Sequence, residues 1–230
     1  MVWGLLIVCI LAIGSFLFYA SYSIASGVYL KAFCRANTRE KVVALTFDDG
    51  PDPIQSPFVL DLLSRYQAKA SFFCIGEKAA QYPEIVRRMY REGHLVGNHS
   101  LQHKNSFPLT PYREMLADLT QTQEILEGII EAPVTFFRPP FGVTNPTVGK
   151  AVRTLGYTTI GWSVRSLDTR GEPVDRIMKR ITKQIRPGAV ILLHDRLPDS
   201  VELLTALFEY LQANEYKVKR VDELINNYAL

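Results

Sequence analysis

Hydrophobic and polar residues are distributed differently in the first thirty positions and in the rest of the chain. Between Val2 and Leu30 there is no Asp, Glu, Lys, Arg or His, and residues 2–20 are almost wholly apolar. An apolar segment of about 20 residues can cross a bilayer as a helix. A cleaved signal peptide is the alternative, although its apolar core is usually only about 7 to 15 residues long. The pattern favours an uncleaved transmembrane anchor at residues 1–30.

From residue 41 onward, short apolar runs alternate with longer amphipathic stretches. The apolar runs predict strands at residues 42–47, 70–75, 94–98, 134–138, 158–164, 189–194 and 216–221. The stretches between them predict helices at residues 56–67, 77–92, 111–129, 145–155, 172–185 and 199–213. This alternation is typical of an α/β fold with a parallel sheet and crossover helices, and seven strands are enough to curl into a barrel. We expect one domain at 41–230, joined to the anchor by a basic juncture at 31–40.

Residues at the helix boundaries support these predicted elements. Thr110 and Pro111 precede the helix expected at 111–129, and Glu114 is placed for a capping interaction. Pro146 falls at the start of the next helix, where its missing N–H does least harm.

Composition and charge limit the possible functions. With 47% hydrophobic and 21% charged residues, the 230-residue chain can build one sizeable core. The net charge of +3 is small and evenly spread, whereas nucleic-acid-binding proteins usually have a concentrated basic face. The three cysteines form no CxxC pair, so neither a thiolate zinc site nor a disulfide framework is indicated. We expect no nucleic-acid partner and no obligate protein partner.

Polar residues suited to chemistry cluster where the predicted strands end. The stretch TFDDGP (46–51) places two aspartates directly after the first strand, and charged or imidazole side chains follow later strands. In barrels and open parallel sheets, ligands and catalytic groups lie at the carboxyl edge of the strands. The residues at these strand ends are Asp48, Asp49, His99, Arg138, Asp168, His194 and Asp195. We therefore expect them to meet at one site.

His99 and His103 form an H-x-x-x-H pair in the stretch NHSLQH. If this segment is helical, both imidazoles face the same way and can reach one ion. Three of the four histidines occupy strand-end positions, whereas His94 precedes a strand and is interpreted as a surface or packing residue. One carboxylate and two imidazoles make a metal site with open positions for water and substrate. The second aspartate can then accept a proton from a metal-activated water, although a turn with two solvated carboxylates also fits TFDDGP in isolation.

Five stretches of the chain combine these residues into an ordered set of motifs. They are TFDDGP (46–51), HSLQH (99–103), RPPFG (138–142), WSVRSLD (162–168) and ILLHD (191–195). In order and spacing the set resembles the five motifs of the polysaccharide deacetylase family, also called the NodB-homology or carbohydrate esterase family 4 domain. The resemblance covers residues 40–225 and implies a distorted (β/α) barrel, usually of seven strands.

The resemblance also implies roles for individual residues. Asp48 would be the general base, held by Arg138, and His194 would be the general acid, held by Asp168. A cation beside Asp48 favours the carboxylate, and a carboxylate beside His194 favours the imidazolium, although ordinary structural ion pairs are the alternative. The implied metal ligands are Asp49, His99 and His103.

The substrate groove follows from the same resemblance. Pro139, Pro140 and Phe141 would shape one wall, with a backbone N–H near Phe141 helping to stabilise the oxyanion. Leu192 would line the pocket for the acetyl methyl group. Trp162 is a further candidate for contact with a sugar ring, although such aromatic residues more often belong to the core.

The fourth motif departs from the family pattern at two positions. Arg165 stands where members commonly have a second aspartate, and Thr169 stands where they commonly have a tryptophan. That tryptophan normally supports the acid histidine and forms a groove wall. We therefore expect acid tuning and substrate shape to differ from those of other members.

The implied function is metal-dependent removal of N-acetyl groups from an N-acetylated glycan, such as peptidoglycan or a chitin-like polymer. The open set of ligands suits zinc, and cobalt, nickel, manganese or iron could occupy it as well. Two alternatives remain open: an O-acetyl esterase of the xylan type or a small-amide hydrolase with the same site, and a glycan-binding module whose chemistry has decayed.

An envelope glycan implies a membrane-anchored protein with its catalytic domain on the extracytoplasmic side. The basic residues near the anchor conflict with this orientation, because all four follow it: Lys31, Arg35, Arg39 and Lys41. By the positive-inside rule they favour a cytoplasmic domain. An upstream basic or second hydrophobic segment would reconcile the two expectations.

Overall fold

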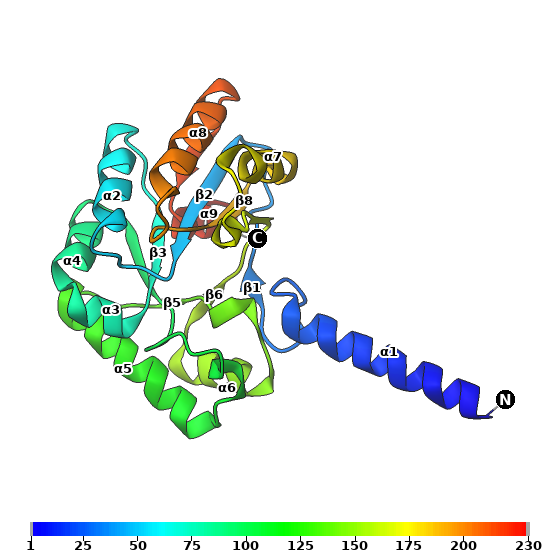
Figure 1. Ribbon diagram of the computed structural model, residues 1–230. Coiled ribbons are helices and arrows are strands. Elements are labelled where there is room, and N and C mark those ends of the chain that lie inside the picture. The colour runs from blue at the N-terminus through cyan, green and yellow to red at the C-terminus, as the bar shows by residue number, and fades with distance from the viewer. Residues whose placement is uncertain (1, 229–230) are drawn as a thin grey trace.

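One curled sheet of nine strands forms the centre of the computed structural model, which describes residues 2–228 (Figure 1). The sheet has the strand order β1-β6-β5-β4-β3-β2-β8-β7, and β9 pairs with β2. All paired strands run parallel. The strands are β1 (Ala32–Phe33), β2 (Val42–Asp48), β3 (Ser71–Cys74), β4 (Leu95–Asn98), β5 (Phe136–Phe137), β6 (Thr158–Ile160), β7 (Val164–Arg165), β8 (Ala189–His194) and β9 (Lys217–Lys219).

Helices cover the outside of this sheet, and one helix projects away from the domain (Figure 1). The α-helices are α1 (Val2–Tyr22), α2 (Gln55–Arg65), α3 (Gly76–Gln81), α4 (Pro83–Arg91), α5 (Tyr112–Ile130), α6 (Pro146–Leu155), α7 (Val174–Gln184), α8 (Ser200–Ala213) and α9 (Val221–Tyr228). Three short 3₁₀ helices are η1 (Phe107–Leu109), η2 (Pro140–Gly142) and η3 (Asp168–Arg170).

Strand β2 places the first of the polar strand ends. Its seven residues are all buried, and the strand pairs with β3, β8 and β9 in the middle of the sheet. A strand buried on both faces reads as a continuous apolar run, which is the pattern VVAL at its start. In the parallel register Asp48 lies opposite Phe73 of β3 and His194 of β8. The carboxyl ends of these strands therefore meet at one edge of the sheet.

The expected α/β fold with a curled parallel sheet is confirmed, and several boundaries differ from the prediction. The helix expected at 77–92 is two helices, since Tyr82 before Pro83 is forced out of the α conformation, with φ −128° and ψ 57°. The strand expected at 158–164 is interrupted between β6 and β7. Gly161 lies there against Cys34, whose Sγ would be only 2.5 Å from an added Cβ.

Four further elements differ from the sequence-based expectations. Strand β9 ends at Lys219, and α9, which no pattern predicted, begins at Val221. Strand β1 was not predicted either, and it lies in the segment that we interpreted as a basic juncture. The expected cap of α5 is wrong: Pro111 itself occupies the N-cap position, without a side-chain hydrogen bond, and its carbonyl accepts from the amide of Met115.

The apolar helix α1 ends in direct contact with the domain. Among the described residues it is the one helix long and apolar enough to cross a membrane, a test that a signal sequence also passes. Its last turn is nevertheless packed, because Ala20 has no exposed surface. The hydroxyl of Thr144 donates to the carbonyl of Ala20 at 3.1 Å, and the amide of Thr144 donates to the carbonyl of Ser21 at 2.9 Å. Hydrogen bonds therefore hold the end of α1 against the domain.

His94 is a buried packing residue, one of the two interpretations of its position. Its Nδ1 accepts a hydrogen bond from the amide of Ala70 at 3.1 Å, and its ring packs edge-on against Phe72. Burial lowers the pKa of His94 from 6.5 to about 4. Three cations act in the same direction: Lys69, Arg220 and Arg88.

This histidine predicts a pH dependence of stability. Between pH 6.5 and 4 the unfolded chain binds a proton at His94 that the folded chain does not, so stability is lost as the pH falls through this window. We expect His94→Asn to remove the effect, because its amide oxygen can still accept from Ala70. Urea unfolding in detergent at pH 7 and pH 4 should show the wild type losing about 3 kcal/mol more than the variant. Equal losses of unfolding free energy in the wild type and the variant would contradict the lowered pKa of His94.

Candidate active site

The two aspartates of TFDDGP separate at the end of β2. Asp48 continues the strand, whereas Asp49 adopts the left-handed conformation with φ 70°. Gly50 follows, and an added Cβ there would lie 2.5 Å from Oδ1 of the buried Asp195. Only glycine therefore fits at this position, and the tight turn directs the two neighbouring carboxylates to different partners.

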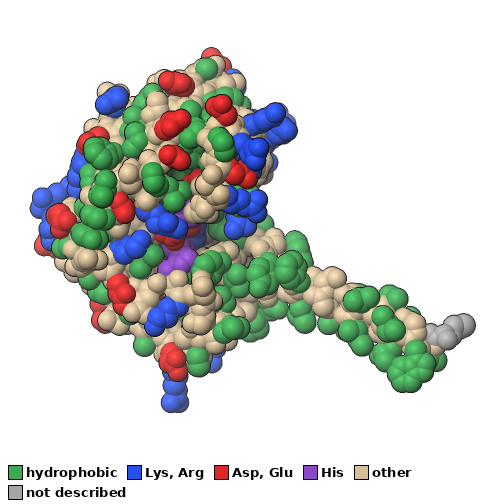
Figure 2. All heavy atoms as spheres, viewed as in Figure 1, with side chains coloured by type: hydrophobic (Ala, Val, Ile, Leu, Met, Phe, Trp, Pro, Cys, Tyr) green, Lys and Arg blue, Asp and Glu red, His purple; other side chains and the backbone are tan. Residues whose placement is uncertain are grey.

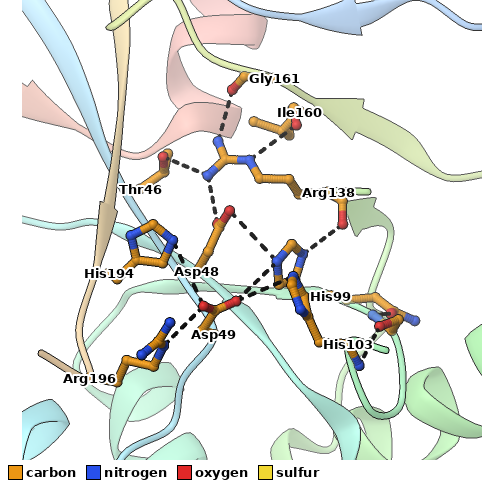
Figure 3. Close-up of polar contacts among 12 residues, drawn as sticks. Thr46, Asp48, Asp49, His99, His103, Arg138, Ile160, Gly161, His194 and Arg196 are labelled. Carbon is orange, nitrogen blue, oxygen red and sulfur yellow. Dashed lines mark hydrogen bonds and ion pairs between the residues drawn. The ribbon is translucent and has the colours of Figure 1, made fainter. Parts of the chain in front are cut away.

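Asp49, His99 and His103 form one cluster (Figure 3). One possible ligand atom from each lies within 4.8 Å of the others, and Oδ1 of Asp49 is 3.5 Å from Nε2 of each histidine. The two histidines do not lie on a helix, the condition considered for their spacing, but on a loop with left-handed residues at Ser100 (φ 68°) and His103 (φ 52°). Asn98 holds the loop, since its Oδ1 accepts from the amide of Ser100 at 2.8 Å.

The chemistry of this cluster suits a divalent metal ion. Nδ1 of His99 lies 2.7 Å from the backbone carbonyl of Arg138, which leaves Nε2 toward the cluster. Burial lowers the pKa of His103 to about 4, so its imidazole is neutral at pH 7. Burial acts to raise the pKa of Asp49, but a hydrogen bond from His99 and the positive charges that the neighbouring histidines carry when protonated hold it well below its usual range. Neutral imidazole and ionised carboxylate are the forms that bind metals.

Arg138 lies fully buried behind Asp48. Its Nη1 donates to Oδ1 of Asp48 at 2.7 Å and to Oγ1 of Thr46 at 2.9 Å. Its Nε and Nη2 donate to the carbonyls of Ile160 at 3.2 Å and Gly161 at 2.8 Å (Figure 3). Burial lowers the pKa of Arg138, and the charge of Asp48 opposes that shift. Oδ2 of Asp48 is left 3.7 Å from Nε2 of His99.

His194, the last residue of β8, faces the cluster from the opposite side (Figure 3). Asp168 holds it twice: Oδ1 lies 2.8 Å from Nδ1 of the ring, and Oδ2 accepts from the backbone amide of His194 at 2.9 Å. Burial acts to lower the pKa of His194, but the hydrogen bond and charge of Asp168 outweigh it and raise the pKa. Nε2 is free to face the site, 3.9 Å from Oδ2 of Asp49.

A pocket of about 360 Å³ opens over these groups. Phe141, Trp162 and Leu192 all line it, whereas Pro140 is buried and lies outside the lining. The ring of Phe141 packs edge-on against His103 at 4.5 Å. Gly142 packs so closely on Trp162 that an added Cβ would lie 2.3 Å from the indole ring.

The two departures from the family pattern also face this pocket. Arg165 and Thr169 both line it, and the guanidinium of Arg165 lies 5.5 Å from the ring centroid of Trp162. Arg165 and Thr169 therefore place a cation and a small hydroxyl on the side of the pocket where the family pattern has an acidic and an aromatic side chain.

Asp195 was expected at the same site, but it is buried against the hydroxyl of Ser56 and does not line the pocket; burial raises its pKa to about 6. Sequence reasoning missed two residues around Asp49. Nε of Arg196 lies 3.0 Å from Oδ2 of Asp49, and Nζ of Lys78 donates to the Asp49 carbonyl at 2.8 Å. The position of Arg196, two residues after His194 at a strand end, was a usable signal for the first of these contacts.

Fold and site together define a class of protein, the hydrolases with an aspartate and two histidines at the carboxyl edge of a curled parallel sheet. A family model for polysaccharide deacetylases matches residues 35–160. The chain belongs to the polysaccharide deacetylase family.

Known members show how far this similarity extends. A peptidoglycan-N-acetylglucosamine deacetylase of Bacillus cereus is 35% identical over 191 residues, which cover 81% of this chain and 89% of that protein. A mutant of BA3943, described as a carbohydrate esterase family 4 (CE4) pseudoenzyme with restored activity, has a TM-score of 0.79 at 28% identity, covering 84% of this chain and 71% of its own. BA3943 is a protein of Bacillus anthracis.

A third relative has a different substrate. A family 4 acetyl xylan esterase from Clostridium thermocellum, solved with a cobalt ion, has a TM-score of 0.75 at 29% identity. The match covers 81% of this chain and 91% of that chain. The same architecture therefore supports both amide and ester substrates among these relatives.

Proposed function

We propose that this protein is a hydrolase that removes N-acetyl groups from an acetylated glycan of the cell envelope. The observation that carries the proposal is that Asp48 and His194 line one pocket together with the cluster of Asp49, His99 and His103. The similarity to a peptidoglycan-N-acetylglucosamine deacetylase supports the choice of an N-acetylated sugar.

Asp49, His99 and His103 would hold a divalent metal ion. Zinc suits two imidazoles and a carboxylate, and the cobalt ion in the related esterase agrees with an open ligand set. When bound, such an ion lowers the pKa of a neighbouring water and polarises the acyl oxygen.

Asp48 acts as the general base in this proposal. It accepts a proton from the water whose oxygen forms a bond to the acetyl carbon. Arg138 fixes the carboxylate by binding Oδ1, so that Oδ2 remains toward the cluster. A base held within reach of the attacking water lowers the barrier by positioning as well as by proton transfer.

His194 acts as the general acid when the carbon–nitrogen bond breaks. An amine leaves poorly as an anion, so the nitrogen must receive a proton. Asp168 orients the ring through Nδ1 and favours the protonated form, which leaves Nε2 to donate. The products are acetate and a free amino sugar.

The proposed substrate contacts lie around the mouth of the pocket. Phe141 and Trp162 would pack against sugar rings, and Leu192 would contact the acetyl methyl group. Pro140 would act indirectly, by fixing the turn that presents Phe141. Arg165 adds a cation beside Trp162, which favours a substrate with electronegative groups on that side.

We further propose that α1 remains attached as a membrane anchor with the catalytic domain outside the cytoplasm. The packing of Ala20 and its hydrogen bond from Thr144 support this, since removal of α1 would uncover that contact. The division into an anchor at 1–30, a juncture at 31–40 and a catalytic domain at 41–230 stays a prediction, and β1 adds a strand from the juncture to the sheet.

Two alternatives keep specific support. The acetyl xylan esterase favours an O-acetyl substrate, and the pseudoenzyme shows that the fold also occurs without native activity. The presence of all three proposed ligands, the base and the acid in this chain argues against decayed chemistry.

Acetate release by the purified full chain tests the proposal. We expect release from N-acetylated chitooligosaccharide and peptidoglycan, loss of activity after treatment with a chelator, and recovery when zinc is returned. Acetylated xylan serves as the ester control. Release from xylan alone would favour the esterase, and activity that survives verified metal removal would contradict the metal-dependent mechanism.

A further inference from the structure

An apolar groove of about 590 Å³ lies beside the catalytic pocket and shares two of its lining residues, Asn105 and Phe141. The rest of its lining includes Ser21 and Tyr22 from the last turn of α1 and Leu109 from η1. Figure 2 shows apolar side chains extending from the edge of the histidine-lined hollow toward α1. The groove therefore connects the catalytic pocket with the base of the apolar helix.

The position of α1 determines where this groove opens. A helix of 21 residues is about 30 Å long, which matches the hydrocarbon thickness of a bilayer. If α1 spans the membrane, Tyr22 at its end lies at the lipid–water interface, where tyrosine is enriched. Because Thr144 binds the carbonyls of Ala20 and Ser21, the domain cannot move away from that interface without breaking these hydrogen bonds.

The exposed residues of the groove suit a hydrocarbon chain better than water. Leu109 is 85% exposed on η1, and Phe141 is 43% exposed at the boundary with the catalytic pocket. Contiguous exposed apolar surface of this kind marks sites of interaction with ligands or membranes. The volume of the groove falls within the range of about 300–1,000 Å³ that is usual for ligand pockets.

We propose that the substrate is an acetylated sugar carried on a membrane lipid. Its hydrocarbon chain lies in the groove along Leu109 and Tyr22, and its sugar enters the catalytic pocket past Phe141. This inference rests on the proposed function and specifies the carrier of the glycan. A free polymer at a distance from the bilayer fits less well, because the end of α1 is bonded directly to the catalytic domain.

A matched pair of substrates tests the inference with the full chain in lipid nanodiscs. The hexadecyl and methyl glycosides of N,N′-diacetylchitobiose carry the same sugar and differ only in the alkyl chain. We expect kcat/KM for acetate release to be higher for the hexadecyl glycoside. In Leu109→Asp the ratio of the two kcat/KM values should fall about tenfold, since a charge replaces an apolar contact with the chain.

Phe58→Asp is the control variant. Phe58 is also an exposed apolar residue, at 55%, but it lies on α2, on the side of the domain away from α1 (Figure 1). Its substitution should leave the ratio unchanged, which separates the groove from a general effect of added charge. A ratio that Leu109→Asp does not change, or activity on the methyl glycoside alone, would overturn the inference and leave the proposed function intact. Inactivity on both glycosides would reject the proposed function, and this inference with it.

Discussion

Asp48→Asn is expected to lower kcat for acetate release by roughly 10²- to 10⁴-fold, the contribution typical of a general base. The amide keeps the size of the side chain but cannot accept the proton of the attacking water. Oδ1 faces Arg138 at 2.7 Å and Oδ2 faces the cluster. The substitution therefore removes the negative charge of a side chain whose position these contacts fix. Initial rates at saturating substrate, measured by acetate release, check this result.

Metal content separates the roles of the two neighbouring aspartates. Asp48→Asn should retain the metal-to-protein ratio of the wild type, whereas Asp49→Asn should lose both metal and activity. Asp61→Asn, a change on the exposed face of α2, serves as the control for loss of one carboxylate. Wild-type kcat in Asp48→Asn would reject the base assignment, and loss of metal in the same variant would make Asp48 a ligand instead.

Arg138→Met is expected to reduce the free energy of unfolding by about 3–5 kcal/mol, because it leaves the buried carboxylate of Asp48 without its cation. Methionine roughly fills the volume of the arginine stem, so most of the loss should come from the unpaired charge and not from a cavity. Four hydrogen bonds disappear together, two of them to the carbonyls of Ile160 and Gly161. Urea unfolding of the full chain in detergent measures the loss.

A double variant identifies the cause of this loss. In Arg138→Met combined with Asp48→Asn, no unpaired charge remains, and the free energy of unfolding should recover by more than about 1 kcal/mol relative to Arg138→Met alone. If the effects of the two substitutions on the free energy of unfolding simply add, then the guanidinium stabilises the fold through the two backbone carbonyls and not through Asp48.

The sequence predicted those parts of the fold and site that depend on local pattern. Buried strands such as β2 and β8 read as apolar runs, and parallel pairing then required Asp48 and His194 to lie side by side. Strand β1, with only two residues, is too short to carry a periodic signal, so it was missed. The loop that holds His99 and His103 could not be told from a helix by sequence, because a spacing of four residues does not distinguish the two.

Most of the site contacts that could not be predicted from the sequence are hydrogen bonds to backbone groups. Arg138 donates to the carbonyls of Ile160 and Gly161, and Asp168 accepts from the amide of His194, and these partners carry no residue-type signature. The roles of the site residues remain predictions that the variants described above can test.

The hydrogen bonds at the end of α1 also determine where the chain can be shortened. A water-soluble version that starts at residue 23 would leave the hydroxyl and amide of Thr144 without their acceptors, the carbonyls of Ala20 and Ser21. A version that starts at residue 19 would keep both acceptors and remove most of the apolar helix. The folded domain therefore begins inside the last turn of the apolar helix α1, and a cut placed at the end of that helix would damage the domain that it was meant to release.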